Sequence, residues 1–521
     1  MRNFLLYLTD QSPAGARVPR PEVQRGATTI SLIKISNLTF AYDGSPDYIF
    51  ENVSFGIDTS WKLGFTGRNG RGKTTFLKLL QGKYEYRGSI TSNVDFEYFP
   101  FEVPPGPEST LEILRSIAGG AGEWELRREI NLLELGGDVL ERPFETLSEG
   151  ERTKVLLAAL FLKENRFLLI DEPTNHLDMH GREVVSEYLS SKAGFILVSH
   201  DRAFLDGCID HILSINKTDI ELQRGNFSSW LQNKERRDNF ELAENDKLKK
   251  EIGRLSDAGR RTAAWSDKLE KTKYATDNSG LKPDRGYIGH KSAKMMSRAK
   301  AIEGRRRAAA EEKAKLLKNI ESAQSLKISQ PGFYTKRFVE LDDVAIFYGD
   351  KKACGGVKFT VERGDRIAIC GKNGAGKSSV LKLICGGELS YSGRFQKASR
   401  LITSYVPQDT SFLRGNLTDY AMVNGIDESL FKAILRKLDF SRTQFEKDMS
   451  DFSSGQKKKV LIAGSLCMNA HLLVWDEPLN FIDVLSRMQL ESLLLSYNPT
   501  IVFVEHDREF CRSIATKTVE L

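Results

Sequence analysis

The stretch GRNGRGKTT at residues 67–75 decides the fold of this 521-residue chain. It follows the apolar run KLGFT (62–66) and leads into TFLKLL (75–80), so a strand, a glycine-rich loop and a helix are expected in succession. Glycines let successive backbone N–H groups and the helix N-terminus point at phosphate oxygens. The stretch therefore predicts a phosphate-binding loop in an α/β domain.

The chain repeats this pattern once, as GKNGAGKSS at 371–379. Three more motifs recur: LSEGE (147–151) as FSSGQ (452–456), LLIDEPTNHLD (168–178) as LLVWDEPLNFID (472–483), and LVSHD (197–201) as FVEHD (503–507). The offsets between the copies lie between 304 and 306 residues. A nearly constant offset indicates two tandem domains, predicted at 31–225 and 331–521, with a linker at 226–330 and a disordered extension at 1–30.

Each domain carries side chains that suit ATP hydrolysis with Mg²⁺. The loop lysine would neutralise the β- and γ-phosphates, and the next hydroxyl and the aspartate that ends the apolar strand would bind Mg²⁺. The following glutamate would orient or polarise the attacking water, and a histidine after the next strand would reach the γ-phosphate. These residues are Lys73, Thr74, Asp171, Glu172 and His200, and then Lys377, Ser378, Asp476, Glu477 and His506.

This set of motifs resembles the ATP-binding cassette ATPases. In that family two cassettes face head to tail, and each nucleotide lies between one phosphate loop and the serine-glycine motif of the other cassette. The resemblance implies a first site made of Gly67, Asn69, Gly70, Gly72, Lys73, Thr74, Thr75, Ser453 and Gly455. It implies a second site made of Gly371, Asn373, Gly374, Gly376, Lys377, Ser378, Ser379, Ser148 and Gly150. Tyr42 and Tyr348 resemble the aromatic residue that stacks on adenine, with an ordinary strand aromatic as the alternative.

The two copies depart from the family in different ways. YVPQ (405–408) supplies Gln408, which the family uses to sense Mg²⁺ and water, whereas YFPF (98–101) has Phe101 at that position. Phenylalanine cannot bind a metal, so the first site is expected to hydrolyse ATP slowly or to respond differently. The serine-glycine motifs carry Glu149 and Ser454 where glycine is usual.

Positive charge is concentrated in the linker. Residues 271–310 hold 11 Lys and Arg against 3 Asp and Glu, a net of +8 in a chain whose net charge is +6. Apolar residues at helical spacing on either side of a glycine- and proline-containing stretch predict a helical hairpin with a basic tip at about 271–300. Such a tip suits RNA phosphates and unpaired bases. The expected RNA or tRNA contacts are Lys273, Tyr274, Lys282, Arg285, Tyr287, His290, Lys291, Lys294 and Arg298, and the alternative is a solvated charged loop.

Two cassettes joined by a long charged hairpin resemble the ABC-F subfamily, which works on ribosomes. The segment 271–296, FSSGQKKKV and DEPLNFID resemble the Lsa-type antibiotic-resistance members. The resemblance implies a cytoplasmic monomer that closes on two ATP and binds the 70S ribosome. Its linker would pass through the tRNA exit site toward the peptidyl-transferase centre and meet 23S rRNA and P-site tRNA. It would protect against lincosamides, pleuromutilins and streptogramin A, and ATP hydrolysis would release it.

Other functions are weighed against this one. No apolar run approaches the 18 or so residues of a membrane helix, so the ATPase subunit of a drug exporter would need a membrane partner, and none is expected. A housekeeping factor for stalled ribosomes stays open, although no arm is inserted into the first cassette. A DNA-organising ATPase is disfavoured because each cassette is complete, so no DNA partner is expected. The six cysteines are expected to be free thiols.

Overall fold

The computed structural model describes residues 32–44, 48–103, 106, 109–215, 220–272, 290, 294, 297, 301, 304–305 and 330–521. We call the described residues before helix α7 the first domain and those from 330 onward the second domain. The six cysteines are free, as expected. Within the described ranges, no helix is both long enough and apolar enough to cross a lipid bilayer.

The first domain combines a six-stranded sheet, a small antiparallel sheet and a helical region. The six-stranded sheet has the order β5-β6-β7-β3-β8-β9 and is parallel except for the pair β8 and β9; the small sheet has the order β2-β1-β4. The strands are β1 (Leu32–Phe40), β2 (Phe50–Asp58), β3 (Lys62–Gly67), β4 (Arg87–Thr91), β5 (Asp95–Phe99), β6 (Arg166–Asp171), β7 (Phe195–Val198), β8 (His211–Ile215) and β9 (Ile220–Arg224). The helices are α1 (Lys73–Leu80), α2 (Thr110–Ile117), α3 (Glu123–Leu132), α4 (Glu149–Phe161), α5 (Met179–Ser190) and α6 (Arg202–Cys208), with the short 3-10 helices η1 (Gly137–Leu140) and η2 (Phe144–Thr146).

The second domain repeats this plan. Its parallel sheet has the order β14-β15-β16-β12-β17, and its antiparallel sheet has the order β11-β10-β13. The strands are β10 (Arg337–Tyr348), β11 (Lys351–Glu362), β12 (Arg366–Cys370), β13 (Ser390–Lys397), β14 (Thr403–Val406), β15 (Leu472–Asp476), β16 (Ile501–Val504) and β17 (Lys517–Glu520). The helices are α9 (Lys377–Cys385), α10 (Leu417–Val423), α11 (Glu428–Lys437), α12 (Ser454–Cys467), α13 (Val484–Tyr497) and α14 (Arg508–Ile514), with η3 (Arg442–Glu446) and η4 (Met449–Asp451).

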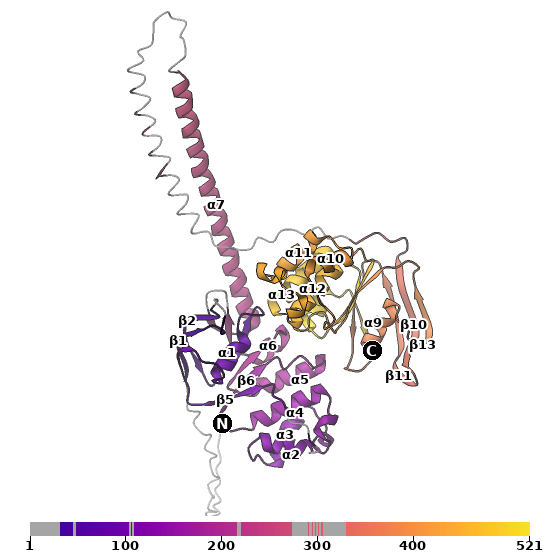
Figure 1. The fold of residues 1–521 in the computed structure, drawn as a ribbon. Helices are drawn as coiled ribbons and strands as arrows, with labels where there is room; N and C mark the ends of the chain where they lie inside the picture. Colours follow the sequence, from indigo (N-terminus) through magenta and orange to yellow (C-terminus); the bar gives the residue numbers. More distant parts are fainter. Residues whose placement is uncertain are drawn as a thin grey trace, which may run out of the picture.

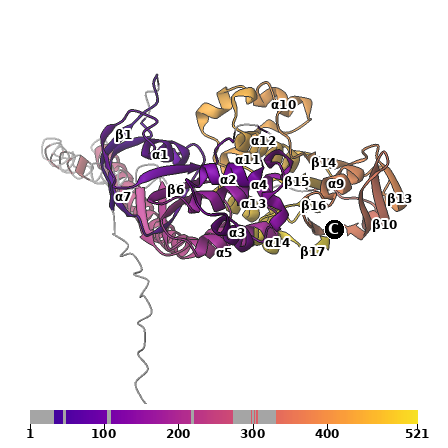
Figure 2. The ribbon, with the colours of Figure 1, turned by 90° about the horizontal axis from the view of Figure 1, so that it is seen from below.

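The two domains are arranged head to tail. Figure 2 shows the antiparallel sheet around β1 at one end of the molecule and that around β10 at the other, with helices of both domains between them. The helical regions therefore lie at the interface, where each domain can reach the phosphate loop of the other. The predicted tandem α/β architecture is confirmed.

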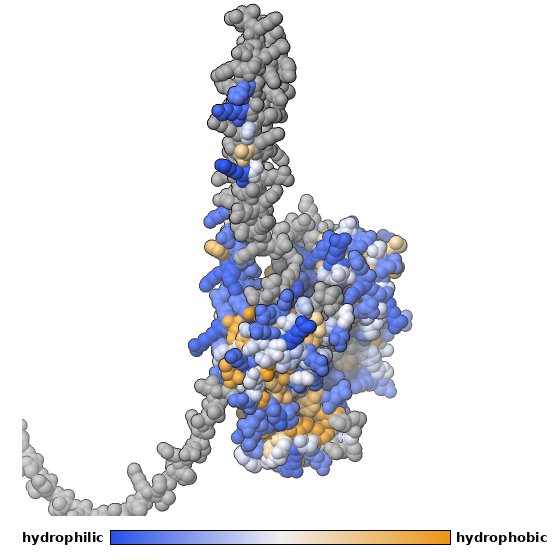
Figure 3. Space-filling view, turned by 60° about the vertical axis from the view of Figure 1, so that its left-hand side comes forward, coloured by the Kyte–Doolittle hydropathy of each residue, from blue (hydrophilic) through white to orange (hydrophobic). Residues whose placement is uncertain are grey.

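Helix α7 (Phe227–Thr272) rises from the first domain and extends well beyond both domains (Figure 1). Its 46 residues span about 69 Å at 1.5 Å per residue. Two of its first residues, Phe227 and Trp230, are buried in the core of the first domain and anchor the helix there. Figure 3 shows a largely hydrophilic surface along the coloured part of this helix. The predicted first arm is thus a helix.

The tip and most of the returning arm fall outside the described residues. Of the predicted RNA contacts, the structure describes His290 and Lys294, and both are helical and exposed. The contacts predicted at Lys273, Tyr274, Lys282, Arg285, Tyr287, Lys291 and Arg298 lie outside the described residues. They stay predictions.

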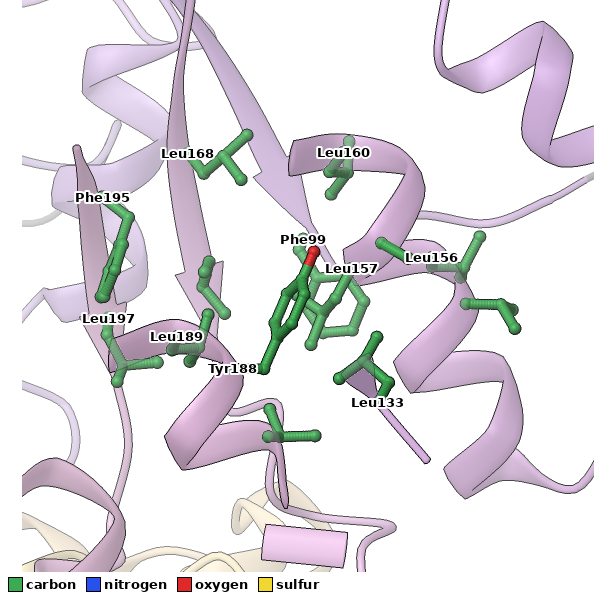
Figure 4. Close-up of a cluster of buried hydrophobic side chains, with 14 of the residues drawn as sticks. Phe99, Leu133, Leu156, Leu157, Leu160, Leu168, Tyr188, Leu189, Phe195 and Leu197 are labelled. Atoms are coloured by element: carbon green, nitrogen blue, oxygen red, sulfur yellow. The ribbon is translucent and has the colours of Figure 1, made fainter. Parts of the chain in front are cut away.

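An apolar core fixes the helices that carry the site residues. In the first domain, leucines of α4 pack with Phe99, Phe195 and the neighbouring leucines of β6 and β7 (Figure 4). Each fully buried side chain of this kind contributes about 1.5–3 kcal/mol. Ser148 begins α4 as a capping box with Glu151, and Ser453 begins α12 as a capping box with Gln456. The serines are therefore held at the ends of well-anchored helices.

Candidate nucleotide sites

Two cavities lie between the domains, and each is built from both of them. The first cavity, of 470 Å³, is lined by the first phosphate loop together with Ser453, Ser454 and Gly455 of the second domain. The second cavity, of 1110 Å³, is lined by the second phosphate loop together with Ser148, Glu149 and Gly150 of the first domain. Ligand pockets usually measure about 300–1,000 Å³, so both cavities have room for a nucleotide.

Most of the residues predicted from the motifs line these cavities. In the first site these are Tyr42, Asn69, Gly70, Gly72, Lys73, Thr74, Thr75, Asp171, Glu172, His200, Ser453 and Gly455. In the second site they are Ser148, Gly150, Tyr348, Asn373, Gly374, Gly376, Lys377, Ser378, Ser379, Gln408, Glu477 and His506. Three predicted residues do not line a cavity but contact residues that do. Gly67 and Gly371 accept hydrogen bonds from the loop lysines through their carbonyl groups, and Asp476 accepts one from Ser378.

The glycines that begin α1 and α9 are required by both backbone angle and space. Gly72 has φ +90° and Gly376 has φ +89°, in the left-handed region that side chains disfavour. A Cβ at Gly72 would lie 2.4 Å from Cγ2 of Ile49, and one at Gly376 would lie 2.8 Å from the carbonyl oxygen of Ala353. Neither position has a side-chain cap, so the first N–H groups of each helix remain available to a phosphate.

The loop lysines are buried cations held by carbonyl groups. Lys73 Nζ donates to the carbonyl of Gly67 at 2.7 Å, and Lys377 Nζ donates to the carbonyls of Gly371 and Lys372 at 2.9 Å. Within the described chain neither ammonium forms an ion pair, and burial lowers the pKa of both. Nearby carboxylates, such as Glu172 for Lys73 and Glu477 for Lys377, favour the charged form but do not outweigh burial. A phosphate in direct contact would stabilise each buried ammonium further.

The residues predicted to hold Mg²⁺ come together in each domain. Thr74 Oγ1 donates to Asp171 Oδ2 at 2.9 Å, and Ser378 Oγ donates to Asp476 Oδ1 at 3.1 Å. Among the described residues no cluster of three or more His, Cys, Asp or Glu side chains suits a metal. One hydroxyl and one carboxylate fit Mg²⁺, which usually takes one or two carboxylates and completes its shell with waters and substrate phosphates.

Two tyrosines that the motif analysis did not single out support these aspartates. Tyr98 OH donates to Asp171 Oδ2 at 2.9 Å, and Tyr405 OH donates to Asp476 Oδ2 at 3.3 Å. Both precede a proline two residues later, in YFPF and YVPQ. The repeat of Tyr-x-Pro in the two copies is the signal that could have identified them.

The candidate catalytic glutamates share a strained backbone. Glu172 has φ 51° and Glu477 has φ 45°, which is uncommon for residues other than glycine and often marks functional sites. Each follows the last residue of its strand and donates its N–H to a neighbouring strand, at Val198 and Val504 respectively. The tight turn holds each carboxylate at the edge of the sheet where the phosphate loop also lies.

The two glutamates differ in their hydrogen-bond partners, and Glu477 of the second site has more of them. Glu477 Oε2 accepts from Gln408 Nε2 at 2.7 Å and from Asn480 Nδ2 at 2.5 Å. Burial raises the pKa of Glu477, but the contacts with His506 and Asn480 outweigh it and hold the pKa below its usual value. His506 Nε2 lies 3.7 Å from Glu477 Oε1 and is buried without a hydrogen-bond partner among the described residues. This nitrogen remains available to a ligand in the second cavity.

In the first site the corresponding carboxylate lacks such partners. Phe101 takes the place of the glutamine and packs against the apolar core instead of lining the cavity. Glu172 Oε1 is buried without a hydrogen bond among the described residues, 3.2 Å from His200 Nε2. Burial, followed by the charge of Asp171, raises the pKa of Glu172 to about 8. Burial and the nearby Lys73 hold the pKa of His200 well below its usual value.

Two asparagines of the phosphate loops connect the domains directly. Asn69 Nδ2 donates to the carbonyl of Phe481 at 2.7 Å, and Asn373 Nδ2 donates to the carbonyl of His176 at 3.3 Å. The acceptors occupy the same position of the repeated motif, in PLNFID and PTNHLD. Both acceptors are backbone carbonyl groups, so the contact does not depend on the side chain. The residue types at these positions, phenylalanine and histidine, therefore did not indicate it.

Comparison with known proteins gives the same family for both halves. The family model described as ABC transporter matches residues 50–175 and 354–480. The chain is a tandem ATP-binding cassette ATPase. Each match contains the phosphate loop and the Asp-Glu strand, which are elements that meet in the two cavities.

Relatives of this ABC ATPase resemble it over most of its length. It is 28% identical to the ATP-binding protein Uup of Caulobacter vibrioides, over 91% of this chain and 74% of the relative. It is 27% identical to the ribosome protection protein VmlR of Bacillus subtilis, over 92% of this chain and 84% of the relative. These relatives agree with the resemblance to ABC-F and Lsa-type proteins that the motifs indicate.

Solved structures share the tandem fold of this ABC ATPase. The archaeal ribosome recycling factor aABCE1, in complex with the ribosomal stalk protein aP1, matches with a TM-score of 0.60 at 17% identity, over 93% of this chain and 87% of that one. The RNase-L inhibitor matches with a TM-score of 0.55 at 19% identity, over 88% and 82%. At these identities the likeness shows the fold alone.

The tyrosines predicted to meet adenine lie at the rims of the ABC ATPase's cavities. Tyr42 and Tyr348 are exposed, and both line a cavity. Their hydroxyls bond to Thr75 Oγ1 at 2.8 Å and to Ser379 Oγ at 3.2 Å. Each ring is therefore tied to the start of the helix that follows the phosphate loop, and adenine stacking stays a prediction.

Proposed function

We propose that this ABC ATPase acts on the ribosome and protects it from lincosamide, pleuromutilin and streptogramin A antibiotics. The observation that carries the proposal is the combination of two cavities completed across the domain interface with a helix of 46 residues rising from one domain. The relative VmlR, named a ribosome protection protein, supports it.

ATP binding would set the position of the linker. Because each cavity needs residues of both domains, ATP in the two sites draws the domains together. Helix α7 is anchored in the first domain by Phe227 and Trp230, so it is carried by that domain. In the closed form the linker passes through the tRNA exit site toward the peptidyl-transferase centre. The basic tip, about 271–300, meets 23S rRNA and the P-site tRNA, and the factor acts in the cytoplasm as a monomer.

The chemistry follows from the residues around each cavity. Lys73 and Lys377 bind the phosphates, and the two serines of the opposite domains close over them. Thr74 with Asp171, and Ser378 with Asp476 and Gln408, would hold Mg²⁺. The ion would neutralise negative charge on the phosphates.

The attacking water is oriented by the glutamates. Glu477 is ionised and held by Gln408 and Asn480, so it can accept a proton from the water at neutral pH. His506 and His200 are placed to reach the γ-phosphate. Hydrolysis separates the domains and releases the factor from the ribosome.

The test uses the Glu172→Gln/Glu477→Gln variant, which should bind ATP without hydrolysing it. It is expected to co-sediment with 70S ribosomes when ATP is present and to lose this binding as salt increases. The matched control, Glu164→Gln/Glu446→Gln, changes two exposed glutamates and should stay on the ribosome no longer than the unchanged protein. Absence of ATP-dependent sedimentation of the trapped variant would refute the proposal.

A second measurement separates protection from housekeeping. The unchanged protein is added to in vitro translation inhibited by one drug of each of the three classes. Restored synthesis is expected for the protection function. Relief of stalled ribosomes with no change in drug inhibition would favour a general translation factor.

A further inference from the structure

Lys458 is an unusual buried residue of the second domain. It lies on α12, five residues after Ser453, and its exposed fraction is 1%. Among the largest fully buried side chains of the described residues, it is the only charged one. A buried ammonium is costly unless its donors are satisfied, so its position is expected to serve a purpose.

Backbone carbonyls alone receive its three donors. Lys458 Nζ donates to the carbonyls of Pro407 at 2.7 Å, Asp476 at 3.1 Å and Gln408 at 3.3 Å. An ammonium group has three N–H donors and no acceptor, so this arrangement uses all of them. Within the described chain the side chain forms no ion pair, and its role is therefore to hold backbone in place.

The three carbonyls lie just beyond the point where the pairing of β14 with β15 ends. The last paired residues of β14 and β15 are Val406 and Trp475. Beyond them the chain continues to Gln408 on one side and to Asp476 and Glu477 on the other. Lys458 bridges these continuations where the ladder of backbone hydrogen bonds has ended.

The bridge lies directly behind the candidate catalytic groups of the second site. Gln408 donates from Nε2 to Glu477 Oε2 at 2.7 Å. Both side chains line the second cavity, whereas Lys458 does not. A shift of either strand end would change the distance between amide and carboxylate, and small misplacements of this kind are costly to catalysis.

The first domain lacks the bridge. Its serine-glycine motif is followed by Thr153 at the position of Lys458, and Phe101 stands at the position of Gln408. Thr153 is buried but carries no ammonium. The bridging cation and the glutamine are therefore present together in one domain and absent together in the other.

We propose that Lys458 is a positioning residue of the second ATP site, which holds the Gln408 loop against the end of β15 so that Gln408 and Glu477 meet correctly. The inference rests on the roles proposed above for these two residues. Lys458 acts through the backbone and does not contact the nucleotide. Its loss should therefore lower turnover much more than ATP binding.

The experiment measures ATPase activity with one site active at a time. Lys458→Thr, which introduces the first-domain residue, is placed in a Glu172→Gln background, where the second site alone turns over. There kcat is expected to fall about 10- to 100-fold while KM for ATP changes less than about 2-fold. In the Glu477→Gln background, where the first site alone turns over, the same change should leave kcat within about 2-fold.

Three further variants keep the test decisive. Lys457→Thr changes the preceding, half-buried residue of the same helix and should leave both backgrounds within about 2-fold. In a Gln408→Ala protein, Lys458→Thr should cost less than about 2-fold more, because the group that it positions is already absent. Lys458→Met, with its melting temperature and its ATP stoichiometry measured, shows whether the domain still folds and binds.

The outcomes separate this inference from the site assignment. Unchanged kcat for Lys458→Thr in the Glu172→Gln background, or equal losses in both backgrounds, would overturn the role of Lys458. If Glu477→Gln itself left the second site active, the assignment of that site would fail instead.

Discussion

The two candidate ATP sites of this protein share their motifs but differ in the groups that hold the proposed catalytic glutamate. In the second site Glu477 accepts hydrogen bonds from Gln408 and Asn480, and Lys458 donates to the backbone carbonyl of Gln408. In the first site Glu172 has a buried oxygen without a hydrogen bond among the described residues, and Phe101 turns into the core. Two sites with the same sequence motifs can therefore differ in the hydrogen bonds that hold the corresponding glutamate.

The pKa values of the two glutamates are shifted in opposite directions. Burial raises the pKa of Glu172 to about 8, which favours its protonated form. The pKa of Glu477 lies below its usual value, so it is ionised. A base must be ionised to accept a proton, and the second site is therefore the better prepared of the two.

The largest expected effect is an unequal loss of ATPase activity. Glu477→Gln should lower kcat about 100-fold or more, because it removes the prepared base. Glu172→Gln should lower total kcat less than about 5-fold, since its site contributes little turnover. Steady-state phosphate release measures both. Equal losses would show that the two sites work alike despite their different surroundings.

A second prediction concerns two ion pairs that join the domains. Arg202 pairs with Glu491, and the side-chain exposures are 14% and 11%; Arg508 pairs with Glu183, and the exposures are 61% and 50%. Burial raises the pKa of Glu491 despite Arg202, so its carboxylate depends on this partner. Breaking a buried pair costs about 3–5 kcal/mol, whereas an exposed pair contributes about 0–1 kcal/mol.

We therefore expect Arg202→Met to weaken ATP binding at least about 10-fold and Arg508→Met less than about 5-fold. Titration of each variant with a fluorescent ATP analogue, in the Glu172→Gln/Glu477→Gln background, measures the difference. Each variant serves as the control of the other, because they change equivalent positions in the two domains. If both variants weakened ATP binding equally, the buried ion pair would contribute no more to domain closure than the exposed one.

A third prediction concerns the stability of the two domains. At one equivalent position the first domain has a buried carboxylate, whereas the second domain has a buried apolar side chain. Glu129 on α3 accepts from Tyr188 OH at 2.7 Å and from Arg128 at 2.9 Å, and Lys192 also contacts it. The residues at the same places on α11 and α13 are Ile434 and Leu493, both buried. Tyr188→Phe should lower the free energy of unfolding by about 1–3 kcal/mol, measured by urea denaturation, and the half-buried Tyr497→Phe serves as the control.

The same group makes the first domain sensitive to acid. Burial raises the pKa of Glu129, but hydrogen bonds from Lys192, Tyr188 and Arg128 outweigh it and hold the pKa below the ordinary value of 4.5. The stabilisation is thus complete above about pH 4.5 and is lost as the pH falls through the lower pKa of the folded state. Acid unfolding that began in the second domain, followed by hydrogen exchange, would contradict this.

The smallest expected effect comes from introducing into the first site the glutamine and the lysine that are found in the second site. Phe101→Gln combined with Thr153→Lys, in the Glu477→Gln background, should raise first-site turnover about 3-fold. Removal of Phe101 from the apolar core costs stability, so the melting temperature is measured with it. Phe101→Leu keeps the core apolar and should not raise turnover. No gain in the double variant would show that more than these two residues separates the sites.

Much of the architecture was predictable because the decisive signals are local. The strand, glycine loop and helix around Lys73 follow in sequence, and the spacing from the loop to Asp171 recurs at Asp476. The helical spacing before residue 272 predicted the first arm of the linker. The contacts of Tyr98, Phe481 and Lys458 were not predicted, because neither local spacing nor the repeated motifs indicate the partners of these residues.

The sequence alone thus determined the chemistry available to this protein: two phosphate loops, two Asp-Glu pairs and two histidines, whose roles depend on residue type and spacing. The tertiary structure decided how well each set is supported. Packing between distant strands and helices decides whether a glutamate is held by an amide, as Glu477 is, or lies beside a histidine without a hydrogen bond among the described residues, as Glu172 does. Burial then shifts the pKa of Glu172 and makes the ammonium of Lys458 a bridge between backbone carbonyls.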